Sequence, residues 1–231
     1  MPIISFVNQK GGCAKSTTAV HFAVWLTQKK KKRVLLVDAD AQGSSSVWLK
    51  GLKEPIPARV LQTADEILDS IKTIGTENDY VIIDGPAGLT EATRAILLLS
   101  DVAIVPCQPS GVDIMSAADA IRLVKQAQAV TKGSPRAALF ISRAVKGTKL
   151  KDEAIALLGK SPEVGLLKSV VHQRQVIADA FGQSQTVWDM AGKSAKDAAK
   201  EYKQLFVEIM SLVDQSQSVA TSQVTAAAAV I

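Results

Sequence analysis

The sequence predicts an α/β fold in which helices cover both faces of a mostly parallel, twisted β-sheet. Apolar residues make up 47% of the 231 residues and charged residues 21%, the balance of a soluble chain with a large core. Short apolar runs alternate with longer segments of helical period, as strands joined by crossover helices do. We expect a single domain over residues 1–214, because one α/β domain commonly reaches this length.

Six apolar runs are the candidate strands. The first four lack polar alternation, which is typical of parallel strands covered on both faces, and the sixth is the weakest. In chain order the runs are residues 3–7, 33–37, 80–83, 102–105, 138–141 and 164–167.

Segments of helical period follow or separate these runs. In chain order they are residues 16–28, 63–74, 89–100, 116–129, 150–158, 175–181 and 195–213. Residues 215–231 are rich in Ser, Ala, Gln and Val without a period, so we expect them to form a disordered tail.

Composition excludes several classes of protein. No apolar run approaches the roughly 20 residues that cross a bilayer, and no signal peptide opens the chain, so we expect a cytoplasmic protein. Cys13 and Cys107 have neither a metal-ligand spacing nor the density of a disulfide scaffold, and both are expected to be free thiols. The net charge of +5 permits a polyanionic partner without requiring one.

A glycine-rich segment between the first predicted strand and helix is the strongest functional signal. It reads Gln9-Lys10-Gly11-Gly12-Cys13-Ala14-Lys15-Ser16-Thr17. Glycines let successive backbone N–H groups point at phosphate oxygens, and a helix N-terminus adds its positive dipole. A lysine supplies a point charge and a hydroxyl can hold Mg²⁺. Gln9 and Ala14 stand where the usual phosphate loop has glycine, and the alternative is a glycine turn with solvated lysines.

The arrangement Lys10-Gly11-Gly12-x-x-Lys15-Ser16-Thr17 resembles the deviant Walker A box of the ParA/MinD family. The resemblance implies a P-loop NTPase of the deviant Walker A type that uses ATP and Mg²⁺, with residues 10–17 binding the nucleotide. Lys10 would be the signature lysine that reaches a dimer partner's nucleotide, Lys15 the phosphate lysine, Ser16 a Mg²⁺ ligand and Thr17 an α-phosphate contact. Ala14 replaces the family's usual glycine, which bears on the turnover rate more than on the fold.

Two further segments resemble motifs of the same family. The run Leu35-Leu36-Val37-Asp38-Ala39-Asp40-Ala41-Gln42-Gly43 resembles its second-strand motif, with Ala41 in place of proline. Carboxylates at the C-terminal end of a buried strand face the ligand crevice of an open sheet. By resemblance Asp40 orients the attacking water and Asp38 joins the Mg²⁺ and water network. The alternative is that either carboxylate only caps a loop.

The third motif is Val81-Ile82-Ile83-Asp84-Gly85-Pro86-Ala87-Gly88, which resembles a Walker B strand leading into a switch loop. Asp84 is therefore expected to act on Mg²⁺ through water. Residues 103–110 resemble the family's fourth-strand exit and its dimer surface, or are a plain strand and turn. Arg143 and residues 176–179 are assigned to the adenine pocket by position alone.

A row of lysines lies along one side of the last predicted helix. At about 100° per residue, one face of this helix is apolar and the lysines lie opposite or on its flank. Each neutralised phosphate releases counterions, and a dimer doubles such contacts. ParA relatives bind nonspecific DNA through basic residues in their C-terminal part, whereas an ordinary solvated face is the alternative. The candidate DNA-binding residues are Lys193, Lys196, Lys200 and Lys203, with Lys168 and Arg174 as additions.

The resemblance implies a short ParA-like ATPase, for which no N-terminal helix-turn-helix domain is expected. Such a protein forms an ATP-sandwich homodimer, binds nucleoid DNA without sequence preference and positions a cargo through a ParB-like or McdB-like adaptor that stimulates hydrolysis. Plasmid-partition ATPases and the carboxysome-positioning McdA group are both of this type. The chain as a whole resembles McdA, but no single residue chooses between them.

A MinD-like membrane-associated ATPase that positions cell division is the alternative function. It would end in a basic amphipathic helix, and no Lys or Arg follows Lys203, so no membrane contact is expected. An iron-sulfur reductase would need cysteines placed for a cluster, and Cys13 lies inside the phosphate loop. A metabolic ligase would need a further substrate pocket, for which His21 and His172 give no constellation.

Overall fold

A seven-stranded sheet runs through the middle of the protein, and all its pairings are parallel. The computed structural model describes residues 1–74, 77–159 and 164–228. The strand order is β3-β2-β4-β1-β5-β6-β7, which confirms the predicted α/β class. The strands are β1 (Ile3–Asn8), β2 (Val34–Asp38), β3 (Ala58–Val60), β4 (Tyr80–Ala87), β5 (Val102–Cys107), β6 (Arg136–Ala144) and β7 (Gly165–His172).

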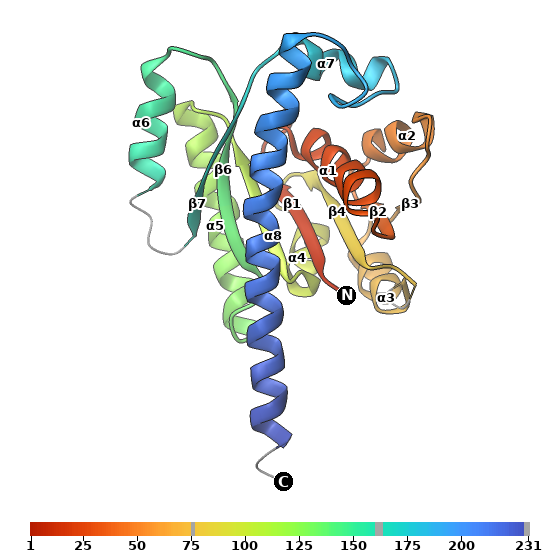
Figure 1. The fold of residues 1–231 in the computed structure, drawn as a ribbon. Helices are drawn as coiled ribbons and strands as arrows, with labels where there is room; N and C mark the ends of the chain where they lie inside the picture. The colour runs from red at the N-terminus through yellow and green to blue at the C-terminus, as the bar shows by residue number, and fades with distance from the viewer. Residues whose placement is uncertain (75–76, 160–163, 229–231) are drawn as a thin grey trace.

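Helices cover both faces of this sheet (Figure 1). Apolar side chains of α1, α2, α7 and α8 form one core, and those of α3, α4, α5 and α6 form the other. The helices are α1 (Lys15–Val24), continued by the π-helix η1 (Trp25–Lys29), α2 (Ser44–Gly51), α3 (Ala64–Ile74), α4 (Glu91–Leu99), α5 (Gly111–Val130), α6 (Lys149–Leu158), α7 (Gln175–Gly182) and α8 (Lys193–Ala228).

The unbroken apolar pattern of the central strands follows from these two cores. On β4, Ile82 packs into the first core, whereas its neighbours Val81 and Ile83 pack into the second. Successive side chains of a strand point to opposite faces, so a strand covered on both faces needs apolar residues at every position.

Two short elements at one edge of the sheet were not predicted. The edge strand β3 has three residues, two of them exposed, so it carries no apolar run. The helix α2 has eight residues, of which only Ser45, Trp48 and Leu49 are buried. Both elements are too short for a sequence period to identify them.

The last helix is longer than predicted. Residues 215–228 continue α8, although the sequence pattern indicated a disordered tail, and residues 229–231 lie outside the described part. Neither Gly nor Pro occurs between 193 and 228, and alanine favours helix. Figure 1 shows that α8 crosses the sheet and extends beyond its edge. Among the described helices, none combines the length and apolar character of a membrane span.

Candidate functional site

A cavity of about 1110 Å³ opens at the C-terminal ends of the central strands. Its wall includes residues at or just beyond the C-terminal ends of β1, β2, β4, β6 and β7. In a parallel sheet these strand ends share one edge, which is where open α/β folds bind ligands. The predicted site residues in the wall are Gly11, Gly12, Ala14, Lys15, Ser16, Thr17, Asp40, Arg143 and Arg174.

Side chains from β6 hold the carbonyl groups of the glycine-rich loop. The Arg143 guanidinium donates to the Gly12 carbonyl at 2.7 Å, and the Ser142 hydroxyl donates to the Cys13 carbonyl at 2.9 Å. In a planar trans peptide the C=O and the next N–H point in opposite directions, so the N–H groups of Cys13 and Ala14 turn away from these anchors. This arrangement suits binding of phosphate oxygens.

Two residues of the loop have left-handed backbone conformations. Gly12 has φ +75° and Ala14 has φ 78°, and α1 begins directly afterwards at Lys15. Glycine adopts this conformation readily, whereas it costs alanine about 1–2 kcal/mol. The departure from glycine at Ala14 therefore leaves the loop formed but strained.

Lys15 and Cys13 both turn toward the interior of the loop. The Lys15 ammonium donates to the Lys10 carbonyl at 3.0 Å, and the residue is 5% exposed. The Cys13 thiol is buried and donates to the same carbonyl at 3.2 Å, and burial raises its pKa. Lys15 is positioned as the predicted phosphate lysine requires, while Cys13 offers a ligand only its backbone. Both cysteines are free, as predicted.

Asp84, at the end of β4, is the residue most suited to hold a cation. Both of its carboxylate oxygens are buried and have no hydrogen-bond partner within normal geometry in the described residues. Burial raises the pKa of Asp84 to about 7; the nearby hydroxyls of Ser16 and Ser45 oppose this shift and the Asp38 carboxylate adds to it. A buried carboxylate without partners is costly unless it binds a cation. These oxygens, beside the Ser16 hydroxyl, fit Mg²⁺, which prefers hard oxygen ligands.

Asp38 and Asp40 have different surroundings. Asp38 is fully buried, and its two oxygens accept the backbone N–H groups of Asp40 at 3.2 Å and Ser46 at 2.8 Å. Asp40 lines the cavity, and its Oδ2 accepts the Ala87 N–H at 3.1 Å, which joins the exit of β2 to the end of β4. Asp40 can therefore contact a ligand or water directly, whereas Asp38 shapes the loop that presents Asp40.

Lys10 is not part of the wall of this cavity. Its ammonium forms an ion pair with Asp113, in the first turn of α5, at 2.9 Å. Asp113 is buried, its Oδ2 also accepts from the Ser110 hydroxyl, and its Oδ1 has no partner in the described residues. Sequence reasoning missed Asp113, although Ser110-x-x-Asp113 has the spacing of a helix capping box.

The predicted lysine row lies on the solvent side of α8. Lys193, Lys196, Lys200 and Lys203 are all exposed, whereas the opposite face of the helix is buried. The predicted amphipathic character of this helix is confirmed. Lys168 is also exposed, on the edge strand β7, where its backbone N–H donates to Glu208 of α8 at 2.7 Å.

Arg174 does not join this exposed surface. Its side chain is 8% exposed and forms an ion pair with Glu201, with 2.6 Å between Nη2 and Oε1. Glu201 also accepts from the backbone N–H of His172 at 3.0 Å. Because Arg174 is paired internally and lines the cavity, its assignment to the DNA-contacting set is corrected here.

Comparisons with known proteins agree with this geometry. The family model for the CobQ/CobB/MinD/ParA nucleotide binding domain matches residues 4–187. The maintenance of carboxysome distribution protein A of Halothiobacillus neapolitanus is 28% identical over 215 residues, covering 90% of this chain and 95% of the relative. Its namesake from Gloeobacter kilaueensis is 27% identical over 216 residues, covering 90% and 93%.

Solved structures extend the likeness to the fold. A Cyanothece McdA–ATP complex has a TM-score of 0.74 at 16% sequence identity, covering 88% of this chain and 94% of that one. The matched region runs from β1 to the segment before α8 and includes the glycine-rich loop, Asp40 and Asp84. The chain belongs to the CobQ/CobB/MinD/ParA nucleotide-binding domain family.

Proposed function

We propose that this chain is an McdA-like ATPase of the ParA type that positions carboxysomes. It is a cytoplasmic protein that binds ATP with Mg²⁺ and forms a homodimer around the nucleotide. The dimer binds the DNA of the nucleoid without sequence preference. A McdB-like adaptor protein then stimulates hydrolysis. The observation that carries this proposal is that the Lys10 ammonium lies outside the cavity of its own subunit, paired with Asp113, where it does not serve that subunit's nucleotide. The carboxysome cargo is proposed from the two relatives that maintain carboxysome distribution.

Different residues of one subunit contact different parts of the nucleotide. Backbone N–H groups of the loop and the Lys15 ammonium neutralise the phosphates, because charge-assisted hydrogen bonds to phosphate are strong. The Ser16 hydroxyl and, through water, Asp84 would hold Mg²⁺, which would supply further positive charge to the phosphates. Arg143 and Ile177 line the cavity and are available to the base.

Hydrolysis needs an oriented water and stabilisation of charge on the transferred phosphoryl group. Asp40 lies in the cavity wall and is the group that positions this water. Lys10 of the second subunit supplies the missing cation, so chemistry depends on the dimer.

The surface around Lys10 suits a second copy of the chain. Val112 and Met115, in the first turns of α5, are 68% and 72% exposed and flank Asp113. Exposed apolar side chains that gather beside a functional residue are typical of interfaces. A second copy seated here covers them and meets Lys10.

DNA binding is assigned to the lysine row of α8. Tyr202, on the buried face of the same helix, lines the cavity, so α8 itself borders the nucleotide site. Lys196→Glu/Lys200→Glu should keep ATP-dependent dimerisation, because the buried face of α8 is unchanged, yet lose retention on random duplex DNA. Each phosphate contact contributes ~0.9 to the slope of log K against log salt, so losing two contacts per subunit should flatten the slope by roughly 3 to 4.

The measurement is retention of the ATP-bound dimer on random duplex DNA over a salt series. A matched control, Lys50→Glu/Lys53→Glu, changes the net charge equally on exposed residues away from α8. An unchanged slope in the α8 variant removes this helix from the DNA surface. Absence of any DNA binding by the parent dimer at low salt contradicts the proposed function.

A further inference from the structure

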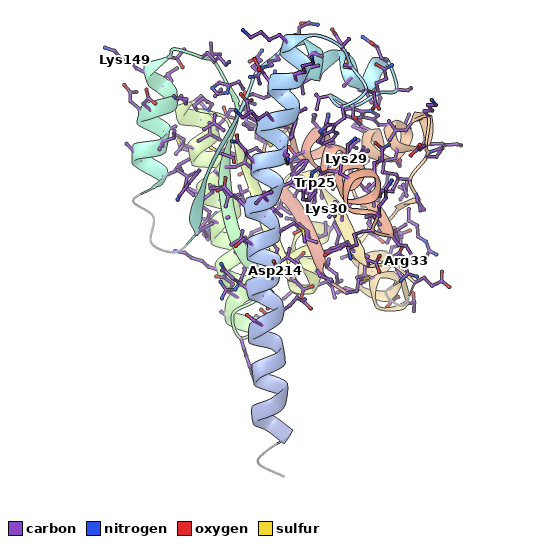
Figure 2. All side chains as sticks on the ribbon, in the orientation of Figure 1. Trp25, Lys29, Lys30, Arg33, Lys149 and Asp214 are labelled. Carbon is purple, nitrogen blue, oxygen red and sulfur yellow. The ribbon has the colours of Figure 1, made fainter. Side chains whose placement is uncertain are left out.

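Five consecutive basic residues run from the last residue of η1 to the residue before β2, and the proposed function does not use them. We call residues 29–33 the basic segment. All five side chains are exposed, and Figure 2 shows Lys29, Lys30 and Arg33 on one side of the molecule together with Trp25. The members of the segment are Lys29, Lys30, Lys31, Lys32 and Arg33.

The basic segment accounts for the net charge of the chain. The sequence contains 27 basic and 22 acidic residues, so the 22 basic residues outside the segment equal the acidic residues in number. The excess of +5 is the charge of these five neighbouring side chains. A local concentration of charge of this kind attracts polyanions far better than the same charge spread over a surface.

The π-helix η1 fixes the start of the segment. The backbone N–H of Lys30 donates to the Trp25 carbonyl five residues earlier, and this wider turn places the Lys30 ammonium 5.0 Å from the centre of the Trp25 ring. Trp25 is 3% exposed and packs against Phe22 and Phe206 of the core. The segment therefore starts from a rigid support.

The other end of the segment is also anchored. The backbone N–H of Arg33 donates to Asp79 at 2.9 Å, and its guanidinium pairs with the same carboxylate at 3.1 Å. Within the described ranges, no carboxylate lies within 4.0 Å of the ammonium groups of Lys29, Lys31 or Lys32. Three neighbouring cations are thus held between fixed ends and are available to an external anion.

The segment lies at the opposite end of the sheet from the nucleotide cavity. It precedes β2, whereas the cavity wall contains residues that follow the strands, and no residue of the segment is in that wall. Helix α8, by contrast, contributes Tyr202 to the cavity wall. The basic segment is separated from the nucleotide cavity by the length of α1 and η1, and none of its side chains reaches the cavity wall.

We propose that the basic segment is a second binding site for the phosphate backbone of DNA, and that it acts in the nucleotide-free chain. The inference rests on the proposed DNA binding and adds a surface that does not depend on ATP. A membrane surface is a poorer match, because membrane-binding segments combine basic with exposed large apolar side chains. Trp25, Leu26 and Val34, the large apolar residues bordering the segment, are all buried.

The test uses Lys29→Gln/Lys31→Gln/Lys32→Gln in the full chain without nucleotide. Fluorescence anisotropy with labelled random duplex DNA is recorded over a salt series. With ~0.9 of salt slope per phosphate contact, losing three contacts should flatten log K against log salt by about 2 to 3. The control Lys50→Gln/Lys53→Gln/Lys132→Gln makes the same change in net charge on scattered exposed residues and should keep a slope close to that of the parent.

Each remaining outcome decides the proposal. An unchanged slope in the segment variant, or an equal loss in the control, overturns it. Binding of the parent protein to phosphatidylglycerol vesicles but not to DNA also overturns the proposal. Lys196→Glu/Lys200→Glu without nucleotide should retain the segment-dependent slope. ATP-dependent DNA binding that survives when the segment site fails leaves the proposed function standing, whereas its loss with an intact segment site contradicts that function alone.

Discussion

Lys10 shows how one ion pair decides what a loop residue can reach. Its backbone carbonyl accepts from Lys15 inside the loop, while its ammonium points to Asp113 of α5. Asp113 has little access to water and keeps one unpartnered oxygen, so it needs a cation. In the proposed dimer Lys10 must leave this partner before it can reach the second nucleotide. Asp113 thus opposes dimer formation in the single chain.

Asp113→Asn should therefore favour the dimer. The amide keeps the shape of the capping residue but loses the charge that holds Lys10. The Lys10 side chain is 39% exposed, so water screens the pair and its worth is about 1 kcal/mol, which corresponds to about a fivefold lower ATP concentration for half-maximal dimerisation. Light scattering during an ATP titration measures this shift. A Lys10→Ala variant that dimerises as well as the parent would show that this lysine does not bridge the subunits.

The site residues could be predicted from the sequence only where they lie inside contiguous motifs. Lys15, Asp40 and Asp84 sit in contiguous runs whose resemblance to family motifs indicates their chemistry, and the fold brings all three to one edge of the sheet. Asp113 and Ser142 escaped prediction because each serves a loop more than 100 positions away in the chain. Arg174 was misplaced because a sequence does not show that Glu201 pairs with it.

At the scale of elements, His21 joins α1 to the segment that precedes α8. Its Nδ1–H donates to the Thr17 carbonyl at 2.7 Å, and its Nε2 accepts the Val187 N–H at 3.2 Å. The ring stacks on Tyr202 with centroids 4.6 Å apart. Burial lowers the pKa of His21 to about 4, so the imidazole stays neutral and this hydrogen-bond pattern fits one tautomer. Helices α1 and α8 therefore share a pH-sensitive contact.

Acidification should loosen this contact. In the unfolded chain His21 is protonated near its ordinary pKa of 6.5, whereas in the folded chain it stays neutral until about pH 4. The stability that neutral His21 contributes to the fold is therefore lost as the pH falls from 6.5 to 4. The linkage amounts to roughly 2 kcal/mol between pH 7.5 and 5. Urea unfolding at the two pH values, compared between parent and His21→Gln, measures it. An identical pH dependence in both proteins would assign the loss to other groups.

The elements that sequence reasoning missed share a physical cause. Buried strands such as β1 and β5 were recognised because both faces require apolar residues, which leaves a continuous run. The edge strand β3 pairs with one neighbour only and has no such run. The extension of α8 beyond 214 was missed because its polar and small residues show no apolar period in the sequence, although they do not interrupt a helix.

At the scale of the whole molecule, one edge of the sheet carries the nucleotide cavity and the surface proposed for a second copy. Asp40 ties the β2 exit to Ala87 at the end of β4, while Lys10 and Asp113 tie the phosphate loop to α5. In the proposed mechanism, ATP binding and dimerisation therefore act on connected segments, whereas the basic segment lies at the opposite ends of the strands.

Asp40→Ala should trap the ATP-bound dimer. Removing the group that orients water slows hydrolysis, commonly by 10²-fold or more, while Lys15 and the loop N–H groups keep their hold on the phosphates. Phosphate release should fall while light scattering with ATP and Mg²⁺ still reports the dimer, and DNA retention should outlast that of the parent. Lys15→Ala is the matched control, because it should lose nucleotide binding itself. If Asp40→Ala loses ATP affinity to the same extent, Asp40 organises the site through its bond to Ala87 and does not act on water.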